Sequence, residues 1–124
     1  MRILMVEEFH EIANAYAQIF RTEGHEVVVA YSGEMALGVL DEFDPDVIVS
    51  DLTMQGMDGW ELCRRLREDR RFVDKIIVAF SGWTEAAEVA TSLLAGFNAH
   101  ICKPARPNVI LTVIGEIMSV KNDG

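Results

Sequence analysis

Five charged or hydroxyl side chains stand directly after short apolar runs of the sequence. Glu7 and Glu8 follow the first run, Asp51 the third, Ser81 the fourth and Lys103 the fifth. Two adjacent acids have a simple explanation at a helix start, where the dipole favours them by up to about 1 kcal/mol. A sharper explanation is a pocket that collects carboxylates in order to hold a cation. The choice depends on whether the fold brings these side chains together.

The apolar runs predict five strands that alternate with five amphipathic helices. We expect the strands over residues 3–6, 27–30, 47–50, 76–80 and 99–102. Several of them are apolar throughout, which is typical of a parallel sheet covered on both faces. Such an alternation implies right-handed crossovers and helices on both faces of the sheet. Ligands of these sheets bind beyond the carboxyl ends of the strands, so all five side chains are predicted at one rim.

The helix boundaries are marked by capping and stop residues. The first helix carries a 3.6-residue stripe that we expect to be buried, formed by Phe9, Ile12, Ala13, Tyr16, Ala17 and Phe20. Asp58 with Glu61 three residues later predicts a capping box for the third helix. The other expected boundary residues are Gly24, Ser32, Asp44-Pro45, Thr84, Gly96 and Pro107.

Composition places the chain among single-domain globular proteins, with one domain over residues 1–124. Its net charge of −9 argues against direct binding of nucleic acid or of an anionic membrane surface. Cys63 and Cys102 lack the spacing of a metal site or disulfide framework, and we expect them to be small core residues. No signal peptide or bilayer-spanning segment is recognisable, so we expect a cytoplasmic protein.

The segment SDLTMQGMDGW at residues 50–60 resembles the phosphoacceptor loop of response regulator receiver domains from two-component systems. Ser81-Gly82 is similar to the family's switch hydroxyl and the small residue after it, and Lys103-Pro104 to its lysine and proline. Glu7-Glu8 falls where the family has its acidic pair. The separations of 30 residues from Asp51 to the serine and 52 to the lysine also match the family. The resemblance covers essentially the whole chain.

This resemblance implies an α/β, flavodoxin-like, doubly wound (βα)5 fold. Its five-stranded parallel sheet would have the order 2-1-3-4-5, with helices on both faces. It implies a phosphoacceptor signalling domain, not an enzyme, in which Asp51 is phosphorylated while Ser81 and Lys103 contact the phosphoryl group. A divalent cation removes the repulsion between two anionic reactants. The implied ligands of Mg²⁺ or Mn²⁺ are Glu7, Glu8, Asp51 and the main-chain carbonyl of Thr53.

Several positions are unusual for the family. Two glutamates replace a pair that normally contains at least one aspartate, and their longer reach, about 1.5 Å, predicts weaker metal binding. Gln55 stands where a proline is usual. His100 replaces the aromatic residue that changes rotamer on activation, so we expect it to act with Ser81 as a switch, with a pH dependence. The alternative is a satisfied core histidine. Trp83 is predicted either to shield the acyl phosphate or to pack in its loop.

The resemblance also implies partners. A sensor histidine kinase or histidine phosphotransfer protein would supply the phosphoryl group, and a downstream protein would receive the signal. The last helix is apolar on more than one side, which predicts a docking surface or a homodimer through the fourth helix, fifth strand and fifth helix. Because the sequence ends soon after that helix, we expect a stand-alone receiver or a receiver separated from its output domain.

Three other protein classes share features with this sequence. A flavodoxin-like cofactor binder is disfavoured because phosphate cradles use glycine and hydroxyl residues, whereas the first loop here begins with two anions. A haloacid-dehalogenase-type phosphatase would have a second aspartate where this chain has Thr53. A pseudo-receiver, with the same fold but no phosphorylation, stays open because fold alone does not determine function.

Overall fold

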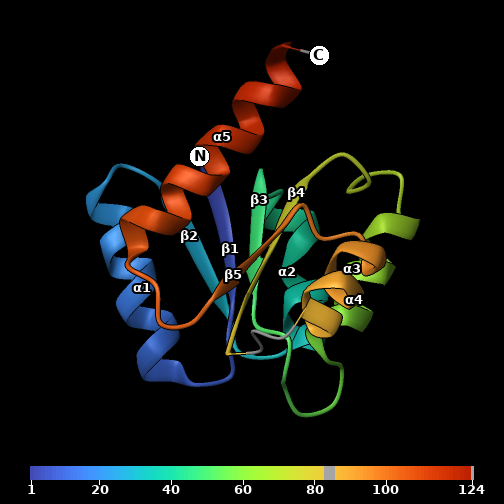
Figure 1. Cartoon of the computed structure of the whole chain (residues 1–124). Helices are drawn as coiled ribbons and strands as arrows, with labels where there is room; N and C mark the ends of the chain where they lie inside the picture. The colour runs from blue at the N-terminus through green and yellow to red at the C-terminus, as the bar shows by residue number, and fades with distance from the viewer. Residues whose placement is uncertain (83–85, 124) are drawn as a thin grey trace.

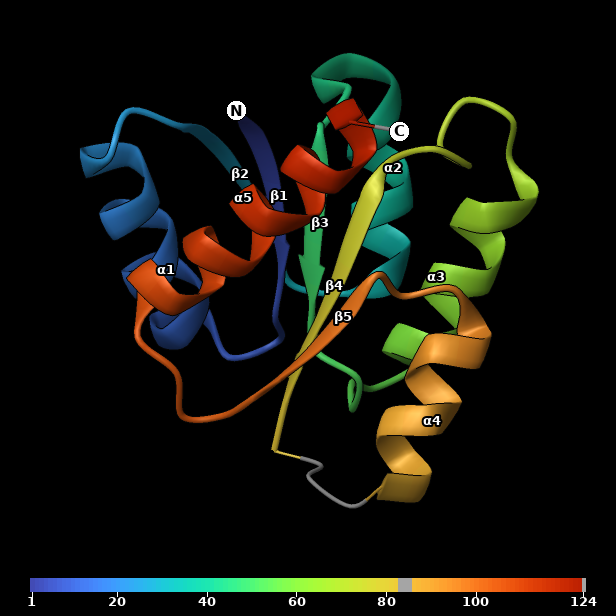
Figure 2. The same cartoon turned by 45° about the horizontal axis from the view of Figure 1, so that its top comes forward.

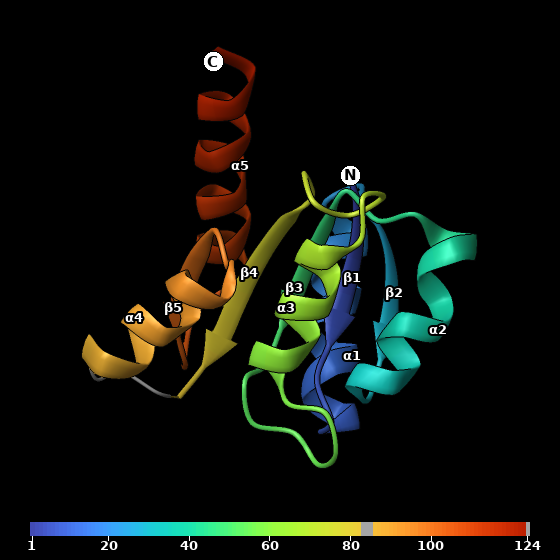
Figure 3. The same ribbon diagram turned by 90° about the vertical axis from the view of Figure 1, so that its right-hand side faces the viewer.

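Five parallel strands form the centre of the molecule in the order β2-β1-β3-β4-β5, as expected (Figure 1). The computed structural model describes residues 1–82 and 86–123. The strands are β1 (Arg2–Val6), β2 (Glu26–Ala30), β3 (Val47–Ser50), β4 (Ile76–Ser81) and β5 (Ala99–Cys102). Figure 3 shows the arrowheads of β1 and β4 pointing to the same end of the sheet.

The strand register places the last residues of neighbouring strands side by side. Val6 of β1 pairs with Ser50 of β3, and Ser81 of β4 pairs with Cys102 of β5. The next residues along the chain, including Asp51 and Lys103, therefore leave the sheet at the same rim. This register is the physical basis for gathering side chains that lie far apart in the sequence.

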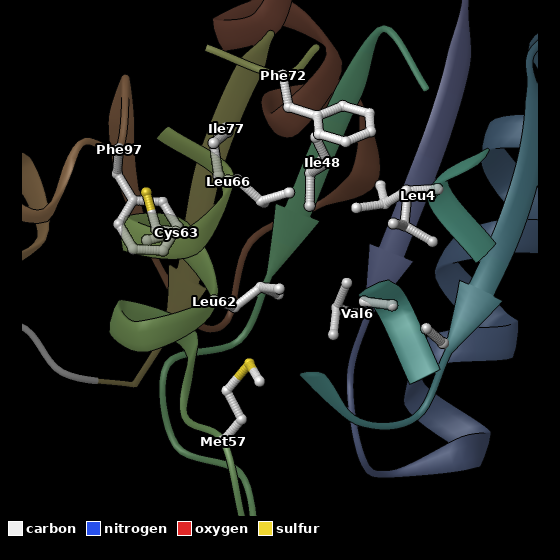
Figure 4. Packing of buried hydrophobic residues seen from close by; sticks show 14 of the residues in the cluster. Leu4, Val6, Ile48, Met57, Leu62, Cys63, Leu66, Phe72, Ile77 and Phe97 are labelled. Carbon is white, nitrogen blue, oxygen red and sulfur yellow. The ribbon is translucent and has the colours of Figure 1, made fainter. Parts of the chain in front are cut away.

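In the part of the chain that the structure describes, five helices cover the two faces of the sheet. They are α1 (His10–Thr22), α2 (Gly33–Phe43), α3 (Gly59–Glu68), α4 (Ala86–Ala95) and α5 (Pro107–Asp123). Helices α1 and α5 pack on one face, while α2, α3 and α4 pack on the other (Figure 2). On the second face, Leu62 and Leu66 of α3 meet Ile48 and Ile77 of the sheet (Figure 4).

Most predicted helix boundaries are confirmed. The Ser32 hydroxyl accepts the Met35 N–H at 3.0 Å, and the Asp58 carboxylate accepts the Glu61 N–H at 2.8 Å. Each bond satisfies a donor that the first helical turn leaves unpaired. Gly24 and Gly96 follow α1 and α4 with positive φ, Asp44 caps α2, and Pro107 begins α5. Thr84 and Trp83 lie outside the described residues.

Two expectations about burial are wrong. The α1 stripe is buried only at Ala13, Ala17 and Phe20, whereas Phe9 is 60% exposed and Ile12 is 40% exposed. Cys63 is buried as expected, but Cys102 is exposed, because it lies at the end of the edge strand β5. Periodicity marks a helix face but does not show how far along the helix its neighbours extend.

Some of the many apolar side chains of α5 are buried in the core, and others are exposed at the surface. Ile110 and Ile114 are fully buried, and Leu111 and Met118 pack against the same core. Val109 and Val120 remain exposed. Within the described residues, no helix combines the length and apolarity needed to cross a bilayer.

Candidate functional site

The carboxyl ends of the strands surround an open pocket of about 490 Å³. Its lining is formed by Glu8, Phe9, Asp51, Thr53, Ser81, Gly82 and Lys103. The pocket therefore contains every predicted site residue except two. Glu7 lies directly beneath it and bonds to Lys103, whereas His100 belongs to a separate polar cluster beside α4.

Three charged groups at the pocket floor form what we call the carboxylate–lysine cluster: Glu7, Asp51 and Lys103. The Lys103 Nζ donates to Glu7 Oε1 at 2.7 Å and to Asp51 Oδ2 at 3.2 Å. Glu7 is fully buried and Asp51 is 7% exposed. The second Asp51 oxygen, Oδ1, accepts the N–H of Leu52 at 2.7 Å. One ammonium group thus faces two enclosed carboxyl groups, which carry one negative charge in excess when both are ionised.

Burial and neighbouring charges shift the pKa values of this cluster. Burial is the main reason that the pKa of Glu7 is raised, and the nearby Asp51 carboxylate raises it further against the opposing hydrogen bond from Lys103. For Lys103, burial lowers the pKa. The hydrogen bond to Glu7 and the charges of both acids outweigh that effect, so the pKa of Lys103 is raised. Lys103 is therefore a firmly charged cation at neutral pH.

The two adjacent glutamates have different surroundings. Glu7 points into the protein, whereas Glu8 is half-exposed and accepts the N–H of Gln55 at 3.1 Å through Oε2. On the other side of the same loop, Glu34 of α2 accepts the N–H of Met57 at 3.2 Å. Two glutamates therefore hold the β3–α3 loop that follows the buried Asp51. The sequence did not single out Glu34, because its acidic side chain is also an ordinary first-turn residue of α2.

Gly59 allows α3 to begin against the backbone of Asp51. Its N–H donates to the carbonyl oxygen of Leu52 at 2.8 Å. A Cβ at this position would lie 2.1 Å from the Asp51 carbonyl oxygen and 2.8 Å from the Leu52 Cα. No side chain fits in that space, so the glycine of the MDGW segment is explained by close approach of two backbone segments.

The oxygen-rich lining suits a hard cation, although no preformed metal cluster is present. Among residues 1–82 and 86–123, no three Asp, Glu, His or Cys side chains are grouped to hold an ion. Glu8, Asp51 and Thr53 nevertheless border the same pocket. Beneath them, Glu7 Oε2 is buried without a hydrogen-bond partner. Oxygen donors of this kind fit Mg²⁺, and Glu8 would first have to leave the Gln55 N–H.

The Lys103 segment is fixed by hydrogen bonds to β4 and α1. The Lys103 N–H donates to the Ser81 carbonyl oxygen at 2.8 Å, and the Lys103-Pro104 peptide bond is cis. The Tyr16 hydroxyl of α1 donates to the carbonyl oxygen of Ala105. Tyr16 therefore acts as a positioning residue for the segment that carries Lys103. Its place in the α1 stripe pointed only to core packing.

A second enclosed polar cluster, which we call the serine hub, consists of Trp60, Ser92 and His100. The Trp60 Nε1–H donates to Ser92 Oγ at 3.2 Å, and His100 Nδ1 lies 3.0 Å from the same oxygen. The Ser92 hydroxyl also lies 3.1 Å from the Glu88 carbonyl oxygen. Ser92 is fully buried, and the hub joins α3, α4 and β5. His100, the β5 side chain that was predicted to switch, is thereby held against Ser92 of α4.

A family model for the response regulator receiver domain matches residues 3–115 of the chain. The chain is 32% identical over 108 residues to the transcriptional regulatory protein AfsQ1 of Streptomyces coelicolor, a match covering 87% of this chain and 47% of that protein. It is 29% identical over 114 residues to an uncharacterised 14.6 kDa protein of Leptolyngbya boryana, covering 92% of this chain and 87% of that protein. The chain thus spans about half the length of AfsQ1.

The fold is also similar to solved structures. A CheY-like response regulator receiver domain protein from Methanospirillum hungatei superposes with a TM-score of 0.88 at 27% identity. That match covers 99% of this chain and 98% of the other. The similarity therefore extends over the sheet, all five helices and the loops that form the pocket.

Proposed function

The chain belongs to the response regulator receiver domain family of two-component signalling, and from that premise we propose that Asp51 accepts a phosphoryl group. The observation that carries this proposal is the carboxylate–lysine cluster. A carboxylate at the floor of an open pocket lies 3.2 Å from a charged ammonium group. The phosphoryl donor would be a histidine kinase or a histidine phosphotransfer protein.

The residues of the pocket have distinct roles in this reaction. Asp51 Oδ attacks phosphorus as the covalent nucleophile. Lys103 contributes a point charge that binds a phosphoryl oxygen, and the Ser81 hydroxyl offers a hydrogen bond to another. Mg²⁺ held by Asp51, Glu8 and the Thr53 carbonyl would, when bound, neutralise the charge of the phosphoryl oxygens. Glu7 keeps Lys103 charged and aimed at the pocket floor.

In this proposal α4, β5 and α5 form the signalling surface, which binds either a downstream protein or a second copy of the chain. Leu94 of α4 is 89% exposed and Leu93 is 51% exposed. Val109 and Val120 of α5 are also exposed. These exposed apolar side chains would gain from burial against a protein partner.

A pseudo-receiver is the second candidate, and one observation favours it. The Glu8 carboxylate is bonded to the Gln55 N–H, and no metal cluster is formed by the described residues. In that case the fold would bind a partner without phosphorylation. The intact Asp51, Ser81 and Lys103 set favours the first candidate.

Intact-protein mass spectrometry after incubation with a small phosphodonor separates the two candidates. The measurement compares wild type with Asp51→Asn, each with Mg²⁺ and with chelator. A live receiver gains a single phosphoryl adduct that requires both Asp51 and Mg²⁺. A wild-type protein that stays unmodified with acyl phosphate, phosphoramidate and phosphoimidazole donors would contradict phosphorylation and leave the pseudo-receiver.

A further inference from the structure

Phe9 occupies a position at which folding alone would favour a different residue. It is the N-cap of α1, and its side chain makes no capping hydrogen bond. Ser, Thr, Asp or Asn at an N-cap would satisfy one of the free N–H groups of the first turn. The phenyl side chain is also 60% exposed, so it gains little from burial. A residue that breaks a local rule without a packing benefit is a candidate for function.

The same side chain borders the pocket that contains Asp51. Phe9 lines this pocket together with Glu8, Ser81 and Gly82. Its backbone is well fixed, because the Phe9 carbonyl accepts the Ala13 N–H at 3.0 Å. One residue further on, the His10 ring stacks on Tyr31 with centroids 3.6 Å apart and planes 20° apart. The phenyl group is thus presented at the pocket from a rigid helix start.

The geometry of phosphoryl transfer determines the direction in which the leaving group departs from the pocket. As an Asp51 oxygen forms its bond to phosphorus, the bond between phosphorus and the donor nitrogen breaks. The electron pair of the broken bond stays on that nitrogen, and a protonated imidazole ring then leaves as neutral imidazole. Attack and departure are roughly in line. The leaving group therefore departs away from Asp51 and out of the pocket whose lining includes Phe9.

We propose that Phe9 is a specificity-determining residue that stacks against the imidazole ring of the phosphodonor. The inference rests on the proposed phosphorylation of Asp51. Aromatic rings prefer offset or edge-to-face contact, and such pairs add attraction beyond the area they bury. A donor whose leaving group has no ring gains none of this contact. Phe9 thereby favours N-phosphoryl imidazole over other small phosphoryl compounds.

Two small donors that differ only in the leaving group test the proposal. Phosphoramidate releases ammonia, and monophosphoimidazole releases imidazole. The measured quantity is the ratio of their phosphorylation rate constants, followed by intact mass with Mg²⁺. We expect Phe9→Ser, which supplies a good N-cap, to lower the imidazole-to-ammonia ratio about fivefold. Phe9→Tyr should restore the ratio to within about twofold of wild type.

Two further variants make the test specific. Phe9→Leu keeps an apolar side chain without a ring, and its ratio should fall with that of Phe9→Ser. Ile19→Ser alters an exposed apolar residue of the same helix that does not line the pocket, and its ratio should match wild type. An unchanged ratio in Phe9→Ser, or a wild-type ratio in Phe9→Leu, would overturn the proposal.

The outcomes also separate this inference from the proposed function. If neither donor modifies the wild-type protein, phosphorylation and the role of Phe9 fail together. If both donors modify wild type at Asp51 and the ratio does not depend on Phe9, only the role of Phe9 fails. We expect both donors to modify the protein. The ratio of their rate constants should be high in variants with an aromatic ring at position 9 and low in variants without one.

Discussion

The carboxylate–lysine cluster and the serine hub both enclose polar groups near β5, but they are balanced differently. The hub is built from an indole, a hydroxyl and an imidazole and contains no carboxylate, and the indole N–H and the serine hydroxyl each have a partner. The cluster holds two carboxylates against one ammonium group. It also leaves Glu7 Oε2 buried without a hydrogen bond. Among the residues that the structure describes, Oε2 of Glu88 beside the hub is also buried without a hydrogen-bond partner.

This difference separates a structural cluster from a chemical one. Buried polar groups that are hydrogen-bonded cost the fold little, whereas buried charge of one sign is expensive unless it is balanced by the opposite charge. A protein selected only for stability would not set two enclosed carboxyl groups against a single ammonium group at the floor of a pocket. An unbalanced anionic site is, however, what a cation requires. The cluster is therefore the region where stability is given up for ligand chemistry.

The largest expected effect comes from closing the space behind Asp51. In Gly59→Ala, the new Cβ would meet the Asp51 carbonyl oxygen at 2.1 Å, so the backbone must shift. We expect a loss of about 3 kcal/mol in the free energy of unfolding. Gly38→Ala is the matched control in α2, because a Cβ at that position would have open space. We expect this substitution to raise the free energy of unfolding by up to about 1 kcal/mol. Urea unfolding of both variants checks the contrast, and equal stabilities would contradict it.

Removing the cation of the cluster should have the next largest effect. Lys103→Met leaves Glu7 and Asp51 facing each other without a counter-charge. We expect a loss of about 2 kcal/mol at pH 7 with chelator present, less than for a fully buried pair because the Lys103 side chain is 24% exposed. The loss should shrink when the acids are protonated at low pH. In the control Lys121→Met, an exposed lysine is removed, and the change should stay below about 0.5 kcal/mol.

The sequence was sufficient to predict the cluster but not the hub. Glu7, Asp51 and Lys103 were predictable because each directly follows an apolar strand, and parallel strands end at one rim. Ser92 carries no such signal. It lies in a helix whose leucines face solvent, so periodicity did not identify its inner face. The exposure of Phe9 was also missed, because a helical stripe does not show where the sheet beneath it ends.

Breaking the hub should cost less than breaking the cluster. Ser92→Ala removes the acceptor of the Trp60 N–H and the partner of His100. We expect a loss of about 1 kcal/mol. Thr91→Ala is a close control, because the neighbouring Thr91 hydroxyl also bonds one turn back, to the Ala87 carbonyl oxygen, but is exposed. Thermal unfolding should separate the two variants, and a loss in Thr91→Ala as large as in Ser92→Ala would assign no special role to the hub.

The smallest predicted effect depends on pH. Because burial raises the pKa of Glu7 above its ordinary value, its contribution favours folding at low pH and is lost as pH rises through the folded-state pKa. Glu7→Gln mimics the protonated form. With chelator present, the variant should therefore gain stability relative to wild type as pH rises from 4 toward neutrality. A variant that loses stability relative to wild type over that range would show that the ionised Glu7 stabilises the fold.

The most direct test of signalling through α4 asks whether phosphorylation of Asp51 in the carboxylate–lysine cluster changes the conformation of the serine hub. Amide chemical shifts of the isotope-labelled protein are recorded with Mg²⁺, before and after addition of phosphoramidate, for wild type and Asp51→Asn. We predict that wild type shows changes at Ser81 and Lys103 that continue to Ser92, His100 and Leu94, while Asp51→Asn shows none. Identical changes in both proteins, or wild-type changes that stop at the pocket, would contradict a receiver that signals through α4.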